Sequence, residues 1–207
     1  MARRSVLIRA DLHIHTMFSP DSSIHPKIIV EQLFAHPYIK AAAITDHNTV
    51  RGYYKVLELA KAYPDILIIP GVEISSYGGD LILLGIAEIP PQPWTVGGVI
   101  DFAHERGGLV VAAHPYRAYG LGDSAKNYKI DAVEILNGGC SRQLNMLAEE
   151  LARAMALPGV AGSDAHRAEE LWTVYTEIQA STDLDEILRA IKRRLVRVAY
   201  AEKSIHF

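Results

Sequence analysis

The chain has 207 residues, of which 49% are hydrophobic and 22% charged, and its formal net charge is −3. These values predict one globular domain, residues 1–207, with a sizeable core, and the weak acidic charge provides no strong basic surface for nucleic acid. Cys140 is the only cysteine, which excludes an intrachain disulfide and a zinc site built from thiolates.

Short apolar runs alternate with amphipathic stretches along the chain. The predicted strands are residues 5–12, 41–45, 66–72, 81–87, 109–113, 132–136, 159–162, 173–178 and 195–201. The predicted helices are residues 26–34, with Pro26 at the first helical position, 50–63, 95–106, 141–156 and 183–194. Repeated strand-then-helix units predict a parallel sheet, and their number favours an α/β barrel.

Two connections have distinct signatures. Residues 77–80, Tyr-Gly-Gly-Asp, predict a hairpin turn. Residues 115–131 form a long irregular connection, and loops of that length are often functional lids or binding loops. The apolar run near the N-terminus is too short for a signal peptide, and no run approaches the ~20 residues of a membrane span, so we expect a cytoplasmic protein without a membrane partner. The oligomeric state stays open.

The first predicted strand leads into a histidine pair, His13 and His15, preceded by Asp11. Because side chains alternate along a strand, residues two apart share a face. Two imidazoles directed at one point suit a transition metal. This motif alone fits two structural histidines equally well.

Later predicted strands also end in polar clusters. In chain order these clusters contain Asp46, His47 and Asn48, then Glu73, then His114, then Glu134 and Asn137, and finally Asp164 and His166. The carboxyl ends of parallel strands meet at one mouth of a barrel, so the clusters should converge there. Histidines and carboxylates repeated in register favour one metal site over scattered structural residues.

Taken singly, several of these residues have a structural interpretation. His114 could be an ordinary loop histidine, and Glu73 could be a salt-bridge partner. Asp164 could belong to a turn or a helix cap, and Asp46 could orient His47 or its loop. Four further histidines fall outside the clusters. We interpret His36, His104 and the terminal His206 as structural or exposed and leave His25 unassigned.

The clusters, in this order, resemble the PHP family (polymerase and histidinol phosphatase). The resemblance covers about residues 6–170 and rests on His13, His15 and Thr16 with Ser19 and Asp21, on residues 44–48, on Gly71 to Glu73, on His114 with Pro115, and on Gly162 to His166. It implies a distorted (β/α)7 TIM-like barrel, two or three divalent metal ions (Mn, Fe or Zn), and hydrolysis of phosphoesters.

The resemblance also implies a set of metal ligands: His13, His15, Asp21, His47, Glu73, His114, Asp164 and His166. We assign catalytic roles to Glu73, as a bridge between metals, and to Asp164 and His166. Members with three metals place a further histidine between the positions of Glu73 and His114. Here that interval holds only His104, within a predicted helix, so the number of metals stays open.

Substrate contacts are predicted from donor chemistry. Neighbouring metals would share a hydroxide that attacks phosphorus. Arg117 is the first candidate for a phosphate donor because a guanidinium binds phosphate through a planar fork, and Arg167 is the second. Asn137 could bind substrate or cap its strand, and the loop residues Tyr116 and Tyr119 could stack on a base. The acid that protonates the leaving oxygen is not identified.

We therefore expect a metal-dependent phosphoric ester hydrolase acting on a small phosphorylated molecule, such as a nucleotide or a histidinol-phosphate-like compound. One alternative is an exonuclease-like phosphodiesterase on short nucleic acids, which the acidic chain disfavours. A non-catalytic metal-binding module is a second, disfavoured because every ligand position is filled. An amidohydrolase is a third, disfavoured because no bridging lysine follows a middle strand.

Overall fold

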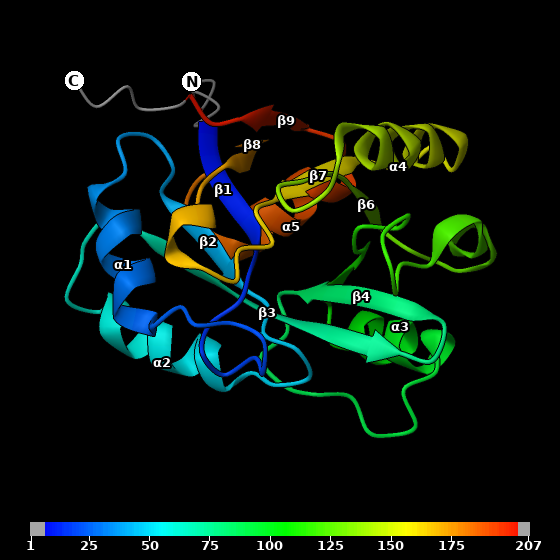
Figure 1. Cartoon of the computed structure of the whole chain (residues 1–207), viewed down its shortest axis with the longest axis horizontal. Coiled ribbons are helices and arrows are strands. Elements are labelled where there is room, and N and C mark those ends of the chain that lie inside the picture. The colour runs from blue at the N-terminus through cyan, green and yellow to red at the C-terminus, as the bar shows by residue number, and fades with distance from the viewer. Residues whose placement is uncertain (1–6, 203–207) are drawn as a thin grey trace.

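Nine strands form one sheet in the computed structural model, which describes residues 7–202. They are β1 (Leu7–Ile14), β2 (Ala41–Ile44), β3 (Leu67–Ser76), β4 (Gly79–Leu84), β5 (Leu109–Ala112), β6 (Ala132–Asn137), β7 (Gly159–Gly162), β8 (Val174–Gln179) and β9 (Val196–Tyr200). Their order across the sheet is β7-β6-β5-β4-β3-β2-β1-β8-β9. Strand β1 therefore lies between β2, which follows it in the chain, and β8, from the opposite end of the chain (Figure 1).

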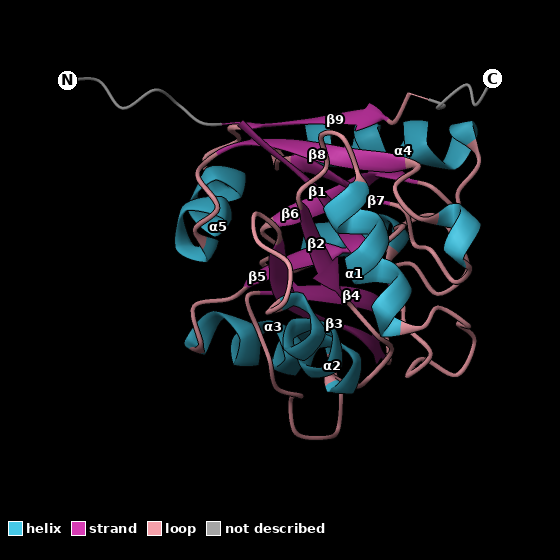
Figure 2. Ribbon diagram, turned by 90° about the vertical axis from the view of Figure 1, so that its left-hand side faces the viewer, coloured by secondary structure: helices cyan, strands magenta, loops and turns pink. Residues whose placement is uncertain are grey.

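Helices pack around this sheet (Figures 1 and 2). They are α1 (Pro26–Ala35), α2 (Arg51–Ala60), α3 (Val96–Glu105), α4 (Arg142–Ala154) and α5 (Leu184–Lys192). Several begin at side-chain caps: Thr95, Ser141 and Asp183 each accept a hydrogen bond from a backbone N–H group of the first turn. His25, left unassigned above, caps α1 in the same way, with Pro26 at the first helical position.

The sheet curls into a nearly closed barrel. Strands β1, β2 and β3 run parallel, as do β5, β6 and β7, while β4 runs antiparallel between β3 and β5. Closure occurs beyond the end of β7, where the backbone N–H of Asp164 donates to the carbonyl of His13 at 2.8 Å. Gly162 permits this approach, because a Cβ atom there would lie 2.2 Å from the Cβ of His13.

The expected fold class, a distorted (β/α)7 barrel, is confirmed. The distortion has two sources: β4 joins as an antiparallel hairpin partner of β3, and β8 and β9 extend the sheet beyond β1. Helix α5 packs its Ile187 and Ile191 against the inward-facing apolar residues of the strands. It contacts the chain where β5 begins, through Lys192 and the carbonyl of Gly108, so the opposite mouth of the barrel stays open for polar groups.

Element boundaries differ from the predictions at several points. The pairing of Ser75 with Asp80 and of Ser76 with Gly79 extends β3 and shifts β4 to Gly79–Leu84, from the predicted 81–87. The predicted strand 5–12 continues to Ile14, and its residues 5 and 6, like His206, lie outside the described residues. Helix α2 stops at Ala60, before the predicted end at residue 63. No helix within residues 7–202 is long and apolar enough to cross a membrane.

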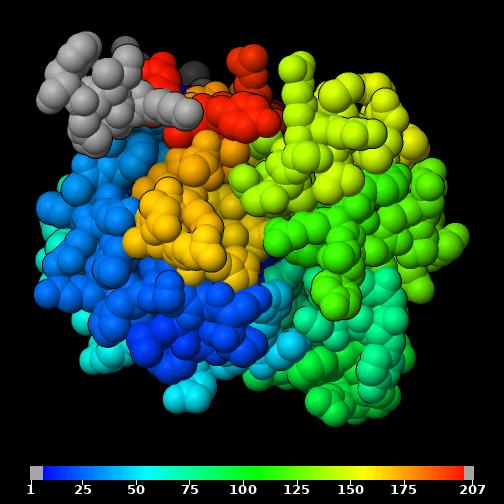
Figure 3. Space-filling model, viewed as in Figure 1, coloured from blue at the N-terminus to red at the C-terminus, as the bar shows by residue number. Residues whose placement is uncertain are grey.

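The connection 115–131 is not structureless. It contains a short 3-10 helix, Gly122–Asn127, where a regular barrel would place a helix between β5 and β6. The backbone carbonyl of Pro115 accepts a hydrogen bond from Gly122 at 2.7 Å, which folds the segment back on itself. Figure 3 shows the loop after β1, this green segment and the yellow-orange segment after β7 meeting around a hollow on one face.

Candidate metal centre

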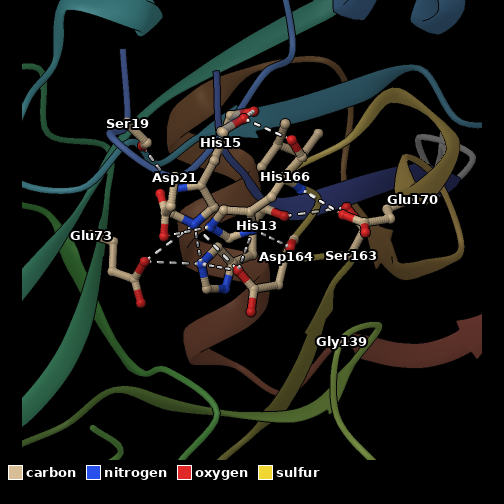
Figure 4. Close-up of polar contacts among 12 residues, drawn as sticks. His13, His15, Ser19, Asp21, Glu73, Gly139, Ser163, Asp164, His166 and Glu170 are labelled. Carbon is tan, nitrogen blue, oxygen red and sulfur yellow. Dashed lines mark hydrogen bonds and ion pairs between the residues drawn. The ribbon is translucent and has the colours of Figure 1, made fainter. Parts of the chain in front are cut away.

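The predicted ligands gather at the carboxyl ends of the barrel strands (Figure 4). His13 lies near the end of β1 and His15 just beyond it, Asp21 lies in the following loop, His47 follows β2, Glu73 lies in β3, His114 follows β5, and Asp164 and His166 follow β7. Most of these side chains are buried, whereas Asp21 is 54% exposed at the rim. Its Oδ2 lies 3.3 Å from His166 Nε2 and 3.5 Å from His47 Nε2.

Glu73 occupies the middle of this arrangement. Its Oε2 lies 3.3 Å from His13 Nε2, 3.2 Å from His15 Nε2 and 3.1 Å from His47 Nδ1. Its Oε1 lies 3.1 Å from His114 Nε2. The two oxygens of one carboxylate therefore face different imidazoles, as a ligand shared by two cations would.

Three groups of side chains bring ligand atoms within 4.8 Å of one another, close enough to share a cation. The groups are His15, His47 and His166; His13, Glu73 and His114; and His13, His15 and Asp164. His13 and His15 each belong to two groups. The geometry thus offers overlapping sites rather than one isolated site.

Hydrogen bonds fix the tautomers of three histidines. Nδ1 of His13 donates to Glu134 at 2.9 Å, and Nδ1 of His166 donates to the carbonyl of Asp164 at 2.8 Å. Nδ1 of His15 donates to Ser19 Oγ at 3.0 Å, because the Ser19 hydroxyl itself donates to Asp46. In each neutral imidazole, Nε2 then carries a free lone pair directed into the centre.

Several polar atoms of the centre lack the partners that burial demands. His114 Nδ1 and His47 Nδ1 make no hydrogen bond, although the latter lies 3.1 Å from Glu73 Oε2 without hydrogen-bond geometry. His13 Nε2 and His15 Nε2 face each other at 3.0 Å, so two lone pairs would oppose each other unless a proton or cation lies between them. Nitrogen and carboxylate donors so arranged fit divalent transition metals.

The pKa shifts of the buried residues also indicate that the centre lacks positive charge to balance its carboxylates. Burial alone would lower the pKa of His13, but the fields of Asp164, Glu134 and Glu73 outweigh it and hold that pKa well above its ordinary value. His15 experiences the same opposition, and its pKa is raised to about 9. Burial would raise the pKa of Glu73, yet His13 and His114 hold it well below its usual range. Raised histidine pKa values beside buried carboxylates mark a centre that favours bound positive charge.

The backbone is strained at two candidate ligands. His114 has φ of 24° and Asp164 has φ of 54°, in the left-handed region that non-glycine residues seldom adopt. Asn48, next to His47, has φ of 55°. Such conformations persist only where the surroundings determine them, and they concentrate at functional sites.

The two arginines predicted to bind phosphate differ in exposure and in their carboxylate partners. Arg117 Nη1 lies 2.5 Å from Asp164 Oδ2, and its side chain remains 42% exposed. Arg167 is 71% exposed, with Nη1 3.7 Å from Glu170. Both arginines line a cavity of about 410 Å³ with Asp21, Asp164 and His166.

Two polar or aromatic candidates are placed differently from the prediction. Asn137 is 1% exposed, and its amide group donates to Glu134 and Asp164 while its Oδ1 accepts from Gly139. The amide nitrogen of Asn137 therefore holds the two carboxylates, which favours a positioning role over direct contact with substrate. Tyr116 packs on the core and donates to Asp123, whereas Tyr119 is 83% exposed beside the mouth.

Glu134 and Ser19 are the positioning residues that the sequence did not assign. Glu134 is buried and accepts hydrogen bonds from His13 Nδ1 and from the backbone N–H of His114 at 2.8 Å, tying two candidate ligands together. An acidic residue inside an apolar strand was an available signal, because buried carboxylates need partners. Asp46 acts through Ser19 and Thr16, and the backbone N–H of His47 donates to Ser19 at 2.9 Å.

Sequence comparison agrees with this geometry. Residues 11–133 match the PHP domain, and residues 142–196 match the PHP-associated model. Uncharacterized protein MJ1587 of Methanocaldococcus jannaschii is 34% identical over 142 residues, covering 63% of this chain and 82% of its own. Uncharacterized protein MJ0417 of the same organism is 29% identical over 215 residues, covering 96% and 85%.

Solved structures share the fold. PsfC from Pseudomonas syringae PB-5123 superposes with a TM-score of 0.71 at 17% identity, covering 96% of this chain and 93% of its own. A protein from Bifidobacterium adolescentis, described as a "putative metal-dependent phosphoesterase", gives 0.62 at 18% identity, covering 76% and 87%. An amidohydrolase from Chromobacterium violaceum gives 0.63 at 16% identity, covering 95% and 99%.

A barrel whose mouth gathers histidines and carboxylates defines a metal-dependent hydrolase of the TIM-like class. Within that class, the chain belongs to the PHP domain family, whose model matches more than half of its length.

Proposed function

We propose that this protein is a cytoplasmic metal-dependent phosphoesterase that hydrolyses a small phosphorylated molecule, with a nucleotide or a histidinol-phosphate-like monoester as the class to test first. The observation that carries the proposal is the set of overlapping ligand groups around the fully buried Glu73. Adjacent cations suit phosphoryl transfer because they can bind the attacking and leaving sides of one phosphate. The exposed Arg117 beside them supplies a donor for an anionic substrate.

In this proposal, the chain's own groups divide the work. His13, His15, His47, His114, His166, Asp21, Glu73 and Asp164 would hold two or three divalent ions (Mn, Fe or Zn). Bound there, such ions supply activation of water and neutralisation of charge on the phosphoryl group. Glu134 and Ser19 keep the imidazoles of His13 and His15 oriented, and Arg117 holds a phosphoryl oxygen.

The size and polarity of the site favour a small substrate. Besides the cavity that contains Arg117, a second cavity of about 530 Å³ is also lined by Asp21. Both have the size usual for small-molecule sites. No lysine lines either cavity in the part of the chain that the structure describes, which weighs against the amidohydrolase alternative. A phosphodiesterase acting on short nucleic acids remains the alternative that a substrate panel would test.

We expect at least two metal ions per chain after loading with Mn or Zn, because the candidate ligands exceed what one ion can use. Elemental analysis of the desalted protein measures this stoichiometry, and assays on a panel of phosphomonoesters and diesters test the activity. His104→Gln is a suitable control, since His104 lies on α3 with Asp131 as its partner. One metal or fewer at saturation would contradict the proposal.

Arg117→Ala should weaken catalysis while leaving the metals in place. A hydrogen bond from a guanidinium to an anion contributes roughly 1.5–3 kcal/mol, so kcat/KM should fall by about 10- to 100-fold. Arg117→Lys should recover only part of the loss, because lysine lacks the planar fork. Arg106→Ala, which alters an exposed ion pair with Glu88, serves as the matched control. Wild-type kinetics in Arg117→Ala would remove the phosphate-binding role.

A further inference from the structure

Asp80 is a buried carboxyl group that the proposed ligand set does not use. It lies in β4 opposite Ser75, while Ile82 of the same strand lies opposite Glu73. Because side chains two residues apart share a face, Asp80 projects from the same face of the sheet as Glu73. Only 6% of Asp80 is exposed, and among the described residues the groups of candidate ligand atoms do not include it. Asp80 therefore lies beside the metal centre without completing it.

The larger cavity gives Asp80 access to a substrate. This cavity of about 530 Å³ is lined by Asp80, by His47 and Asp21 of the centre, and by Tyr77 and Tyr119. The two tyrosines are 78% and 83% exposed, although each carries a large apolar ring. Exposed aromatic rings beside a polar cavity provide surface for an organic group.

The two cavities divide the site into a charged side and a side with aromatic rings. Arg117 and Arg167 line the smaller cavity, and Asp21 lines both, so the candidate metal centre lies between them. A phosphoryl group at the centre can face the arginines with its non-bridging oxygens. In that orientation the organic part of the ester would enter the cavity that contains Tyr77 and Tyr119, with the leaving oxygen on the side of Asp80.

Resting on the proposed phosphoesterase function, we propose that Asp80 is the general acid, whose protonated carboxyl group donates a proton to the leaving oxygen of a phosphomonoester held between Tyr77 and Tyr119. Among the acids and histidines that line this cavity, Asp21 and His47 are candidate metal ligands. Asp80 is the carboxyl group that remains free to carry a proton.

The surroundings of Asp80 favour retention of that proton. Burial, followed by the negative charge of Glu73, raises its pKa to about 6. The opposing influences are His114 beyond β5, a hydrogen bond from Ser75 on β3, and His13 on β1. The direction of this shift is the one that a proton donor requires, and the place of Asp80 in the wall of the cavity, beside the candidate metal centre, provides the geometry for that role.

The step balances as follows. A water oxygen forms a bond to phosphorus, the bond between phosphorus and the ester oxygen breaks, and its electron pair stays with that oxygen. The proton of Asp80 moves to the same oxygen, so the leaving group departs as a neutral alcohol. The attacking water loses its proton to solvent, inorganic phosphate is released, and solvent returns a proton to Asp80.

The test compares leaving groups in the metal-loaded enzyme. Asp80→Asn keeps the shape of the side chain but cannot donate the proton as an acid. We expect kcat/KM for an alkyl phosphomonoester to fall by about 100-fold or more, the usual range for general acid catalysis. For p-nitrophenyl phosphate, whose leaving group needs no proton, the loss should stay below about fivefold. Asp101→Asn, on α3, is the matched control and should match wild type on both substrates.

Two further measurements separate the possible roles of Asp80. Elemental analysis should show equal metal content in wild type and Asp80→Asn, and loss of a metal from the variant would identify Asp80 as a ligand and overturn the proposal. In wild type, the alkyl ester rate should decline at high pH where the p-nitrophenyl rate does not, which tests the acid without any substitution. Equal losses on both esters, or none, would overturn the acid role alone. Absence of hydrolysis in loaded wild type would instead overturn the proposed function.

Discussion

Replacing Glu73 by Gln should lower phosphomonoester hydrolysis by at least about 100-fold, a barrier increase near 2.7 kcal/mol. Glu73 is fully buried, and its oxygens face His13, His15, His47 and His114 at 3.1–3.3 Å. Glutamine has the same size but is neutral, and it presents an NH2 group where a cation would need an oxygen. Cations that share Glu73 would lose their common ligand, and water activation would decline with them.

Kinetics and metal content measured on the same samples would test this prediction. Circular dichroism should show an intact barrel, because the substitution lies at the mouth and not among the apolar side chains of the strands. Glu177→Gln is the matched control, since Glu177 on β8 pairs with Arg9 away from the centre. If Glu73→Gln retained full activity with its metals in place, Glu73 would not be the shared ligand.

The positions of the candidate ligands could be predicted because the sequence signal is local. Each lies at or just beyond the carboxyl end of a short apolar run, apart from Asp21 in the loop after β1, and parallel strands bring those ends to one mouth. His13, Glu73 and His166 illustrate this: they come from elements distant in the chain, yet all lie at the mouth (Figure 4). The alternation rule also held for His13 and His15, whose Nε2 atoms face each other at 3.0 Å.

The partners of those ligands depend on contacts that the sequence does not specify. Glu134 binds His13 across 121 positions in the chain, and Arg117 pairs with Asp164 across 47 positions. The sequence allows Asn137 either to bind substrate or to cap its strand, but its orientation depends on the carboxylates of Glu134 and Asp164. The direction in which such a side chain points depends on how its strand pairs with the neighbouring strands. For Asp80, only the register of β3 with β4 indicates which face it occupies.

The fold, like the site, could be predicted where the sequence signal is local and could not be predicted where it depends on pairing between distant strands. Alternating units predicted the barrel, whereas the pairing of β8 with β1 in antiparallel orientation could not be predicted from periodicity. That pairing connects segments from opposite ends of the chain, such as Arg9 and Glu177, which are 168 positions apart. The shift of β4 has a local cause, because the hairpin turn lies at Tyr77 and Gly78 and fixes which residues of β3 and β4 face each other.

Removing the metals should destabilise the protein, and the size of the effect should depend on pH. Ions that bind only the native state stabilise it by about 2.7 kcal/mol when the free ion is at 100 times its Kd. For a domain of this length, that corresponds to a Tm difference of roughly 5–11 °C. Differential scanning calorimetry before and after chelation, with metal loss confirmed by elemental analysis, measures it.

The pH dependence follows from the histidines of the metal-free centre. The pKa of His15 is raised to about 9 and that of His13 well above its ordinary value, so bound protons stabilise the metal-free fold. That stabilisation is complete below the unfolded pKa of about 6.5 and is lost as pH rises towards about 9. The metal-loaded protein does not depend on these protons, since ions replace them. The Tm gain from metal should therefore be larger at pH 8.5 than at pH 6.5. An unchanged melt after complete metal loss, or a gain that shrinks with rising pH, would contradict the proposed centre.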